Sequence, residues 1–115
     1  MVGIKRIYAA FYETAGGKAP VRDWLLSMDK ADRQIIGEDI ASVEFGWPIG
    51  MPVCRPLGNG LWEVRSGLTG NRIARVLFSI MGQQMVILHG FVKKTQKTPP
   101  DDMALARKRL KEITE

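Results

Sequence analysis

The stretch LWEVRSGLTGNRIARVLFSIMGQQMVILHGFVK, from Leu61 to Lys93, decides the fold. Its apolar residues fall into three runs, which predict strands at Leu61 to Ser66, Arg72 to Ile80 and Met85 to about Lys93. Only short connections that contain glycine separate the runs. Because parallel neighbours need crossovers of about a dozen residues or more, the sequence predicts an antiparallel meander.

Two helices and a further strand are expected before the meander. Ile4 to Tyr12 is typical of a strand, Pro20 suits the first turn of a helix, and Asp29 suits the cap of a second helix. Apolar residues recur at helical spacing in both helical segments, namely Val21, Trp24, Leu25 and Met28, then Ile36, Ile40 and Val43. Glycines and prolines between residues 46 and 60 predict a loop.

A helix is expected after the meander. Thr98 suits its cap, Pro99 and Pro100 its first turn, and Met103, Ala106, Leu110 and Ile113 form one apolar stripe. The expected order is β-α-α-β-β-β-α in one α+β domain over residues 1–115. We expect a mainly antiparallel sheet with a helical hairpin on one face and a C-terminal helix.

Composition excludes several classes of protein. At 115 residues and 45% hydrophobic content, the chain can form one hydrophobic core that needs no disulfide bond or structural metal for stability. The single cysteine, Cys54, excludes a disulfide framework, and no Cys, His or acidic cluster has metal-ligand spacing. Gly58-Asn59-Gly60 lacks the following helix of a phosphate loop. No apolar run approaches about 18 residues. We therefore expect a soluble cytoplasmic protein without metal, cofactor or membrane contact.

The positive charge is confined to the middle of the chain. Net charge is +5 overall, but residues 53–97 hold seven basic residues and one acidic residue, a net of +6. The basic residues are Arg55, Arg65, Arg72, Arg75, Lys93, Lys94 and Lys97, and the acidic one is Glu63. A localised positive field attracts polyanions, of which nucleic acid is the commonest, although a basic surface also serves solubility.

Two arginines in neighbouring strands are candidates for phosphate binding. Alternation puts Glu63 and Arg65 on one face of their strand and Trp62 and Val64 on the other. Arg75 is a charged residue in the apolar centre of the next strand, where a lone charge is costly. One interpretation is an ion pair between Arg75 and a carboxylate such as Glu63. The other places Arg65 and Arg75 side by side on an open sheet face, where they bind phosphate.

The end of the third strand supplies further candidates. Lys93, Lys94 and Lys97 fit either phosphate contact or solvation of a strand end. Phe91 lies beside them and could stack on a nucleobase, and Arg72 could add a backbone contact. His89, the only histidine, fits a hydrogen-bonded core residue or a proton shuttle.

Three segments together resemble a known family. LWEVR (Leu61–Arg65), NRIARVLFSI (Asn71–Ile80) and HGFVKKTQKTP (His89–Pro99), before DDMALARKR, resemble the phage-derived Gp49-like branch of the RelE/HigB toxin superfamily. The resemblance covers nearly the whole chain, and HGFVKKTQKTP is its most specific part. Members have the RelE/ParE-like order β-α-α-β-β-β-α.

The resemblance implies a toxin of a type II toxin–antitoxin pair. Such toxins are metal-independent endoribonucleases (mRNA interferases) that cut mRNA, often on the ribosome, and inhibit translation until a small helix-turn-helix antitoxin neutralises them. Carried over, the arginine that contacts the scissile phosphate falls on Arg75, the arginine ending the preceding strand on Arg65, and the basic pair on Lys93 and Lys94. Either lysine could transfer protons.

The chain departs from the ribosome-dependent members at two points. Glu63 stands where a basic residue is common, and no tyrosine or second histidine follows the lysines. Glu63 is either a general base or an ion-pair partner that positions Arg65. Since no acid–base pair is evident, a ParE-like gyrase poison and a basic sheet that binds RNA without cutting it remain as alternatives.

Overall fold

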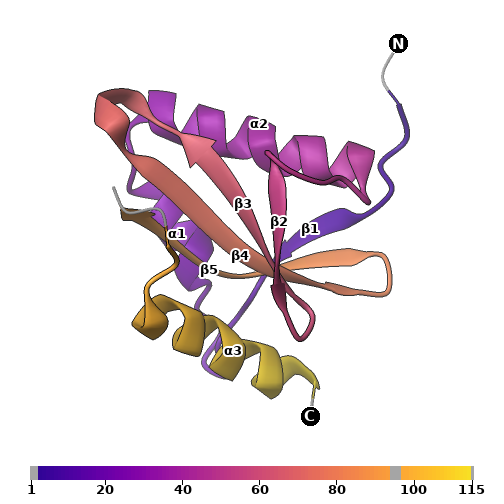
Figure 1. Cartoon of the computed structure of the whole chain (residues 1–115). Helices are drawn as coiled ribbons and strands as arrows, with labels where there is room; N and C mark the ends of the chain where they lie inside the picture. The colour runs from indigo at the N-terminus through magenta and orange to yellow at the C-terminus, as the bar shows by residue number, and fades with distance from the viewer. Residues whose placement is uncertain (1–2, 94–96, 115) are drawn as a thin grey trace.

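The structure, a computed structural model, describes residues 3–93 and 97–114. Strand β1 (Tyr8–Phe11) precedes helices α1 (Pro20–Leu26) and α2 (Lys30–Gly46), as Figure 1 shows. The next elements are strands β2 (Cys54–Gly58) and β3 (Leu61–Gly67), the 3-10 turn η1 (Thr69–Asn71), strands β4 (Ile73–Met81) and β5 (Gln84–Lys93), and helix α3 (Pro100–Thr114). The predicted α+β class is confirmed.

One sheet contains all five strands, in the order β1-β5-β4-β3-β2. β2, β3, β4 and β5 are antiparallel neighbours, so the predicted meander is confirmed. β1 pairs with β5 in parallel, with Tyr8 opposite Gln84. The chain can join these two strands in parallel because both helices and strands β2, β3 and β4 lie between them in sequence.

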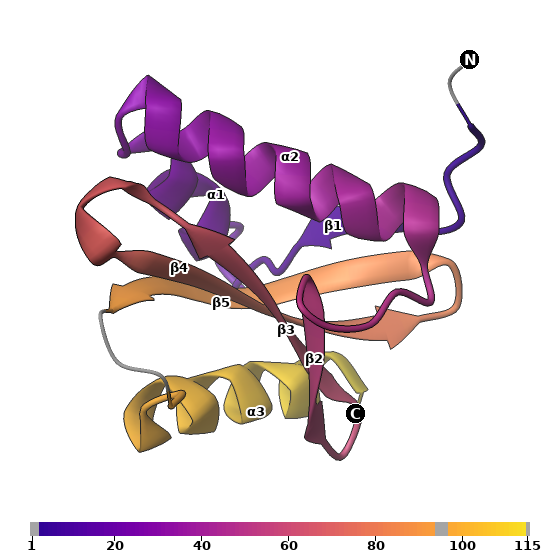
Figure 2. The ribbon, with the colours of Figure 1, turned by 45° about the horizontal axis from the view of Figure 1, so that its top comes forward.

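The helices cover both faces of the sheet, with α1 and α2 on one side and α3 on the other (Figure 2). α1 and α2 pack on the sheet through a core of apolar residues that includes Val21, Leu25, Ile36, Ile40, Val43, Val64, Val76, Phe78, Met85 and Ile87. The core under α3 is smaller and includes Leu61, Leu77, Leu88, Phe91 and Ala106, with Met103, Leu110 and Ile113 partly buried. The predicted stripe of the C-terminal helix thus faces the sheet.

The structure differs from the sequence prediction at Cys54–Gly58, which forms β2 where a loop is expected. Pro56 cannot donate a ladder hydrogen bond, which argues against a central strand but is tolerated at a sheet edge, and β2 is an edge strand. Gly58 and Gly60 have φ values of 92° and 81°, a left-handed conformation that favours glycine, and they turn the chain from β2 into β3.

Gly90 fixes how α1 sits against the sheet. The Trp24 ring packs so closely on this glycine that a Cβ atom there would lie 2.3 Å from Trp24 Cζ3. Only glycine allows this approach of helix and strand. The contact therefore sets α1 against the half of β5 that ends near the basic residues.

Neither a bilayer-spanning helix nor a metal-binding cluster occurs among the described residues. No helix there combines the length and apolar character that a bilayer crossing requires. No group of three or more His, Cys, Asp or Glu side chains among the same residues could hold a metal ion.

Candidate nucleic-acid interface

The sheet register aligns charged residues of three strands on the face that α3 covers. Arg65 of β3 lies directly opposite Arg75 of β4, and Arg75 lies opposite Phe91 of β5. One step along, Glu63 of β3 lies opposite Arg55 of β2. The predicted alternation of β3 is confirmed, since Trp62 and Val64 belong to the core on the other face.

Glu63 is a buried carboxylate whose two oxygens are both engaged. Its side chain is 0% exposed. Oε1 accepts a hydrogen bond from Arg65 Nε at 2.7 Å, and Oε2 accepts one from the Thr98 hydroxyl. Charge-assisted bonds of this kind are stronger than neutral ones and fix geometry. Glu63 therefore holds Arg65 in one orientation and ties the start of the C-terminal segment to the sheet.

Arg75 is fully buried, at 0% exposure, so the expectation of an open sheet face is wrong at this residue. Burial is the main cause that lowers the pKa of Arg75, and the charges of Arg65 and Arg55 lower it further. The negative charge of Glu63 acts the other way and favours the protonated guanidinium. A lone charge at this depth would be costly. Glu63 thus offsets the mutual repulsion of three arginines.

Arg65 remains accessible above this buried charge. Its side chain keeps 22% of its surface exposed while its Nε stays bound to Glu63. Arg55, on the neighbouring edge strand, is exposed. These two guanidinium groups, unlike that of Arg75, can therefore meet a ligand in solution without a change of structure.

His89 is a satisfied histidine in this structure. Its Nε2 lies 2.7 Å from Asp102 Oδ1 in the first turn of α3, and its ring stacks on Phe91 with the centroids 5.6 Å apart. Phe91 itself is 7% exposed, so its ring packs inside the protein rather than presenting a face for a nucleobase. Both residues join β5 to α3.

Helix α3 is held over this face by further polar contacts. Arg109 Nη1 donates to the carbonyl oxygen of Leu88 at 2.8 Å, and Arg107 Nη2 donates to that of Leu57 at 3.2 Å. Together with the bonds from Thr98 and Asp102, these contacts join α3 and its leading segment to β2, β3 and β5. The described part of this segment is thus attached to the sheet at several points along its length.

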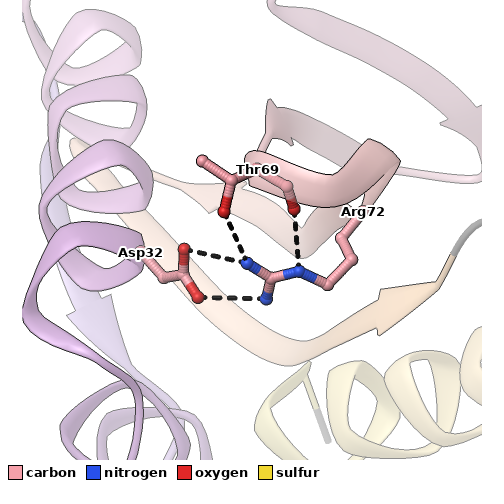
Figure 3. A network of polar contacts seen from close by, with 3 residues as sticks. All are labelled: Asp32, Thr69 and Arg72. Carbon is pink, nitrogen blue, oxygen red and sulfur yellow. Dashed lines mark hydrogen bonds and ion pairs between the residues drawn. The ribbon is translucent and has the colours of Figure 1, made fainter.

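Arg72 lies apart from the other arginines. Its Nη1 and Nη2 donate to the two carboxylate oxygens of Asp32 in α2 at 3.0 and 3.2 Å, and its Nε donates to the Thr69 carbonyl at 2.9 Å (Figure 3). The bond to Asp32 is the main cause that raises the pKa of Arg72. Because α2 covers the opposite face of the sheet, the structure does not bring Arg72 to Arg65.

The lysines lie where the chain leaves the sheet. Lys93 is the last residue of β5, is exposed, and lies opposite Ile73. Lys97 is also exposed and directly precedes Thr98, which contacts Glu63. Lys94 lies outside the described residues. The described lysines thus extend the positive surface beyond the two exposed arginines.

Sequence reasoning missed three residues at this face. Arg55 was counted in the basic segment but could not be placed, since its strand was interpreted as a loop. Thr98 was assigned to helix capping, yet α3 begins at Pro100 and the Thr98 hydroxyl bonds to Glu63. Asp102 carried no signal beyond its place in a first helical turn. Recognising β2 would have found Arg55 by alternation alone.

The chain matches the model of one known protein family. It belongs to the family described as Phage derived protein Gp49-like, whose model matches residues 23–111, and this family is the RelE/HigB-like toxin branch. A comparison with curated proteins finds no match. The matched range runs from within α1 to the last turn of α3 and includes every residue of the basic face described above.

Proposed function

We propose that this chain is the toxin of a type II toxin–antitoxin pair and cleaves mRNA without a metal ion. The observation that carries the proposal is the Glu63–Arg65 pair, a buried carboxylate 2.7 Å from the Nε of a partly exposed arginine, within a patch of exposed cations. Membership of the RelE/HigB-like toxin branch supports it.

The exposed cations would bind the RNA backbone. Arg55, Lys93 and Lys97 are exposed at or near the rim of the face that contains Arg65. Contacts of this kind position RNA without reading its sequence, and they make affinity fall as salt rises. On this proposal the three residues set the path of the strand, and Arg65 meets the phosphate at its centre.

Cleavage follows from the chemistry of RNA itself. The 2′-hydroxyl attacks the adjacent phosphorus, the bond to the 5′-oxygen of the next nucleotide breaks, and the product carries a 2′,3′-cyclic phosphate. The protein has to align the attacking oxygen and stabilise the charge that develops on the phosphate oxygens. Arg65, held by Glu63, is preorganised for the second task.

Arg75 acts through its neighbours in this scheme, because a fully buried guanidinium cannot touch a phosphate outside. Its charge interacts favourably with Glu63, and the hydrogen bond from Arg65 Nε to Glu63 keeps Arg65 in place. We therefore assign Arg75 as a positioning residue, with Arg65 as the phosphate contact. Glu63 fits the same supporting role better than that of a general base, since both of its oxygens accept hydrogen bonds within the protein.

Proton transfer falls to Lys93 or Lys94, or to groups of the ribosome. Lys93 is exposed on the strand that also carries Phe91 and His89, whereas His89 is bound to Asp102. The proposed partners are accordingly mRNA, on or off the ribosome, and a helix-turn-helix antitoxin.

The direct test is induction of the protein in cells, followed by mapping of transcript 5′ ends and measurement of translation. New cleavage sites and a fall in translation are expected, and their joint absence would refute the proposal. With purified protein, cleavage in the presence of EDTA should continue and leave 2′,3′-cyclic phosphate ends. Loss in EDTA of a cleavage that the purified protein performs on the same RNA without ribosomes would refute metal independence.

Matched variants separate contact from positioning. Arg65→Ala should lower the cleavage rate about 100-fold or more, as removal of one transition-state donor does, while the protein stays folded. Arg72→Ala is the control, because Arg72 is bound to Asp32 on the far side of the sheet. Equal losses in both variants would contradict the assignment of Arg65.

A specific observation also favours a second candidate, a protein that binds RNA without cutting it. Among the described residues of this face, the carboxylates of Glu63 and Asp102 and the His89 ring are all hydrogen-bonded within the protein. Tight binding with intact RNA on a gel, with and without ribosomes, would support this candidate. Gyrase-dependent DNA breaks with intact mRNA would instead indicate a gyrase poison.

A further inference from the structure

A groove lies on the side of the molecule away from the basic face, between α1, α2 and β1. It encloses about 340 Å³. Helix α1 contributes Arg22, Leu25 and Leu26, and α2 contributes Arg33, Gly37 and Ile40. Figure 2 shows these elements on the face of the sheet opposite α3. The groove therefore has no part in the proposed RNA contacts.

The floor of the groove is apolar and its charged residues are all basic. Leu26 is 56% exposed, an unusual position for a large aliphatic side chain at the mouth of a hollow. The charged residues that line it are Arg22 and Arg33. Arg22 is exposed and makes no hydrogen bond or ion pair with the described part of the chain. An apolar strip with arginines on it suits a partner that is apolar in the centre and acidic at its flanks.

Gly37 points independently to a partner at the same place. It lies in the middle of the 17-residue helix α2, is exposed, and a Cβ atom there would meet nothing within 4 Å. Glycine disfavours the helical state about five-fold relative to alanine, so its presence needs a reason. The fold supplies none, because no neighbour within the described chain approaches. Close approach of another backbone to α2 would supply one.

A second hollow lies next to the groove along α1. It encloses about 500 Å³ and shares Phe11 and Arg22 with the first. Its other charged residues, Glu13, Lys18 and Asp23, are of both signs, so the acidic flank of a ligand is expected over the first hollow, beside Arg22 and Arg33.

The form of the occupant follows from the β1 edge. A partner strand would need the outward N–H groups of β1, but the Ala9 N–H already donates to Glu44 Oε2 of α2 at 2.8 Å. That contact blocks part of the edge against strand addition. A helix needs no such groups, and it presents apolar residues at i, i+3, i+4 and i+7 to a groove of this kind.

We propose that this groove, lined by Leu25, Leu26, Gly37 and Ile40 with Arg22 and Arg33 beside them, binds an acidic amphipathic helix of the antitoxin. The inference rests on the proposed function for the identity of the partner. Because the groove lies on the α1–α2 side of the sheet, the bound helix leaves the basic face uncovered. On this proposal the antitoxin neutralises the toxin through the volume that it adds to the far side of the molecule.

The test uses the full chain and the protein encoded by the adjacent reading frame, co-expressed and then titrated by calorimetry. Gly37→Leu fills the groove, while the free space at this position and the high helix propensity of leucine keep the chain folded. It should weaken binding about 30-fold, as loss of a hot spot does. Ser42→Leu is the control, since Ser42 is exposed on α2 and does not line the groove.

Two further measurements identify what binds in the groove. Arg22→Glu should weaken binding about ten-fold, with the largest effect at low salt. Amide exchange in the complex should slow along α1 and α2. Protection confined to Tyr8–Phe11 would mean strand addition, and a dimer of the chain alone that Gly37→Leu dissociates would mean a second copy. Either result overturns the proposal.

Failure of this inference and failure of the proposed function give different results. Gly37→Leu that binds as tightly as the wild type, or an adjacent protein that does not bind, overturns the groove assignment and leaves toxicity untouched. A wild-type chain that binds its partner through the groove but cleaves no RNA refutes the nuclease proposal and leaves the groove in place.

Discussion

Replacing Glu63 with glutamine tests whether one buried carboxylate holds the basic face together. The substitution conserves side-chain volume, so no cavity forms. A glutamine oxygen can still accept from Thr98 or Arg65, but the negative charge that offsets Arg65 and Arg75 is lost. The two arginines, directly opposite each other in β3 and β4, then repel without compensation. Glu63→Gln should therefore destabilise the fold and release Arg65.

The magnitude follows from burial. Removing one partner of a fully buried ion pair costs about 3–5 kcal/mol, because a buried charge is left uncompensated. Arg65 is 22% exposed and can recover part of its hydration, whereas Arg75 is fully buried and cannot. The lower end, about 3 kcal/mol, is the appropriate expectation. For a chain of this size that loss corresponds to a fall in Tm of roughly 10 °C.

Thermal unfolding followed by circular dichroism at neutral pH measures this change. Glu38→Gln is the matched control, since Glu38 is exposed on α2 and its carboxylate accepts a bond from Gln34 at 3.3 Å. The control should shift Tm by no more than about 2 °C. If the Glu63→Gln protein has the same Tm as the Glu38→Gln control, the argument that the charge of Glu63 compensates those of the arginines is refuted.

Three other measurements follow from the geometry. Arg55→Ala should weaken binding of RNAs of different sequence by similar factors and reduce the salt slope by about 0.7, whereas Arg6→Ala, which changes an exposed arginine outside the face, should not. Gly90→Ala should cost about 1–3 kcal/mol of stability, because its Cβ would overlap the Trp24 ring; an unchanged Tm would contradict that contact. Burial raises the pKa of Cys54 to about 11, so its thiol stays protonated at pH 8 and should react with iodoacetamide only after denaturation, and rapid labelling of the folded protein would contradict its burial.

Local patterns predicted most of the fold. The apolar runs and the short connections over Leu61–Lys93 were enough for three strands and their antiparallel pairing, and alternation put the β3 side chains on the correct faces. Alternation fails in β5, where a register shift leaves Ile87 in the core under α1 and α2 but Phe91 in the core under α3. The stripe of α3 was also predicted, because helical spacing is a local property. β2 was not, since Pro56 and the flanking glycines have turn character, and the pairing with β3 that makes a strand of this segment is a tertiary interaction.

The candidate site depended on contacts that the sequence does not contain. Arg72 was interpreted as a ligand contact, but a carboxylate 40 positions earlier in the chain, Asp32, binds it. Thr98 was expected to serve its own helix and instead bonds to a carboxylate 35 positions away. Hydroxyl and guanidinium groups have several possible partners of similar strength, so only the packed structure decides among them.

Burial finally separates the cations that could meet RNA from those that support them. Arg65 and Arg75 are equivalent in sequence, one in each of two adjacent strands, and the register puts them side by side. Only Arg65 keeps exposed surface, whereas Arg75, one strand further from the β2 edge of the sheet, is fully buried. Burying a charge costs desolvation free energy, so we expect a charge that is kept inside the protein to contribute by fixing the positions of its neighbours. Buried Glu63 and buried Arg75 thus support a surface on which Arg65, Arg55 and Lys93 are the groups available to a phosphate.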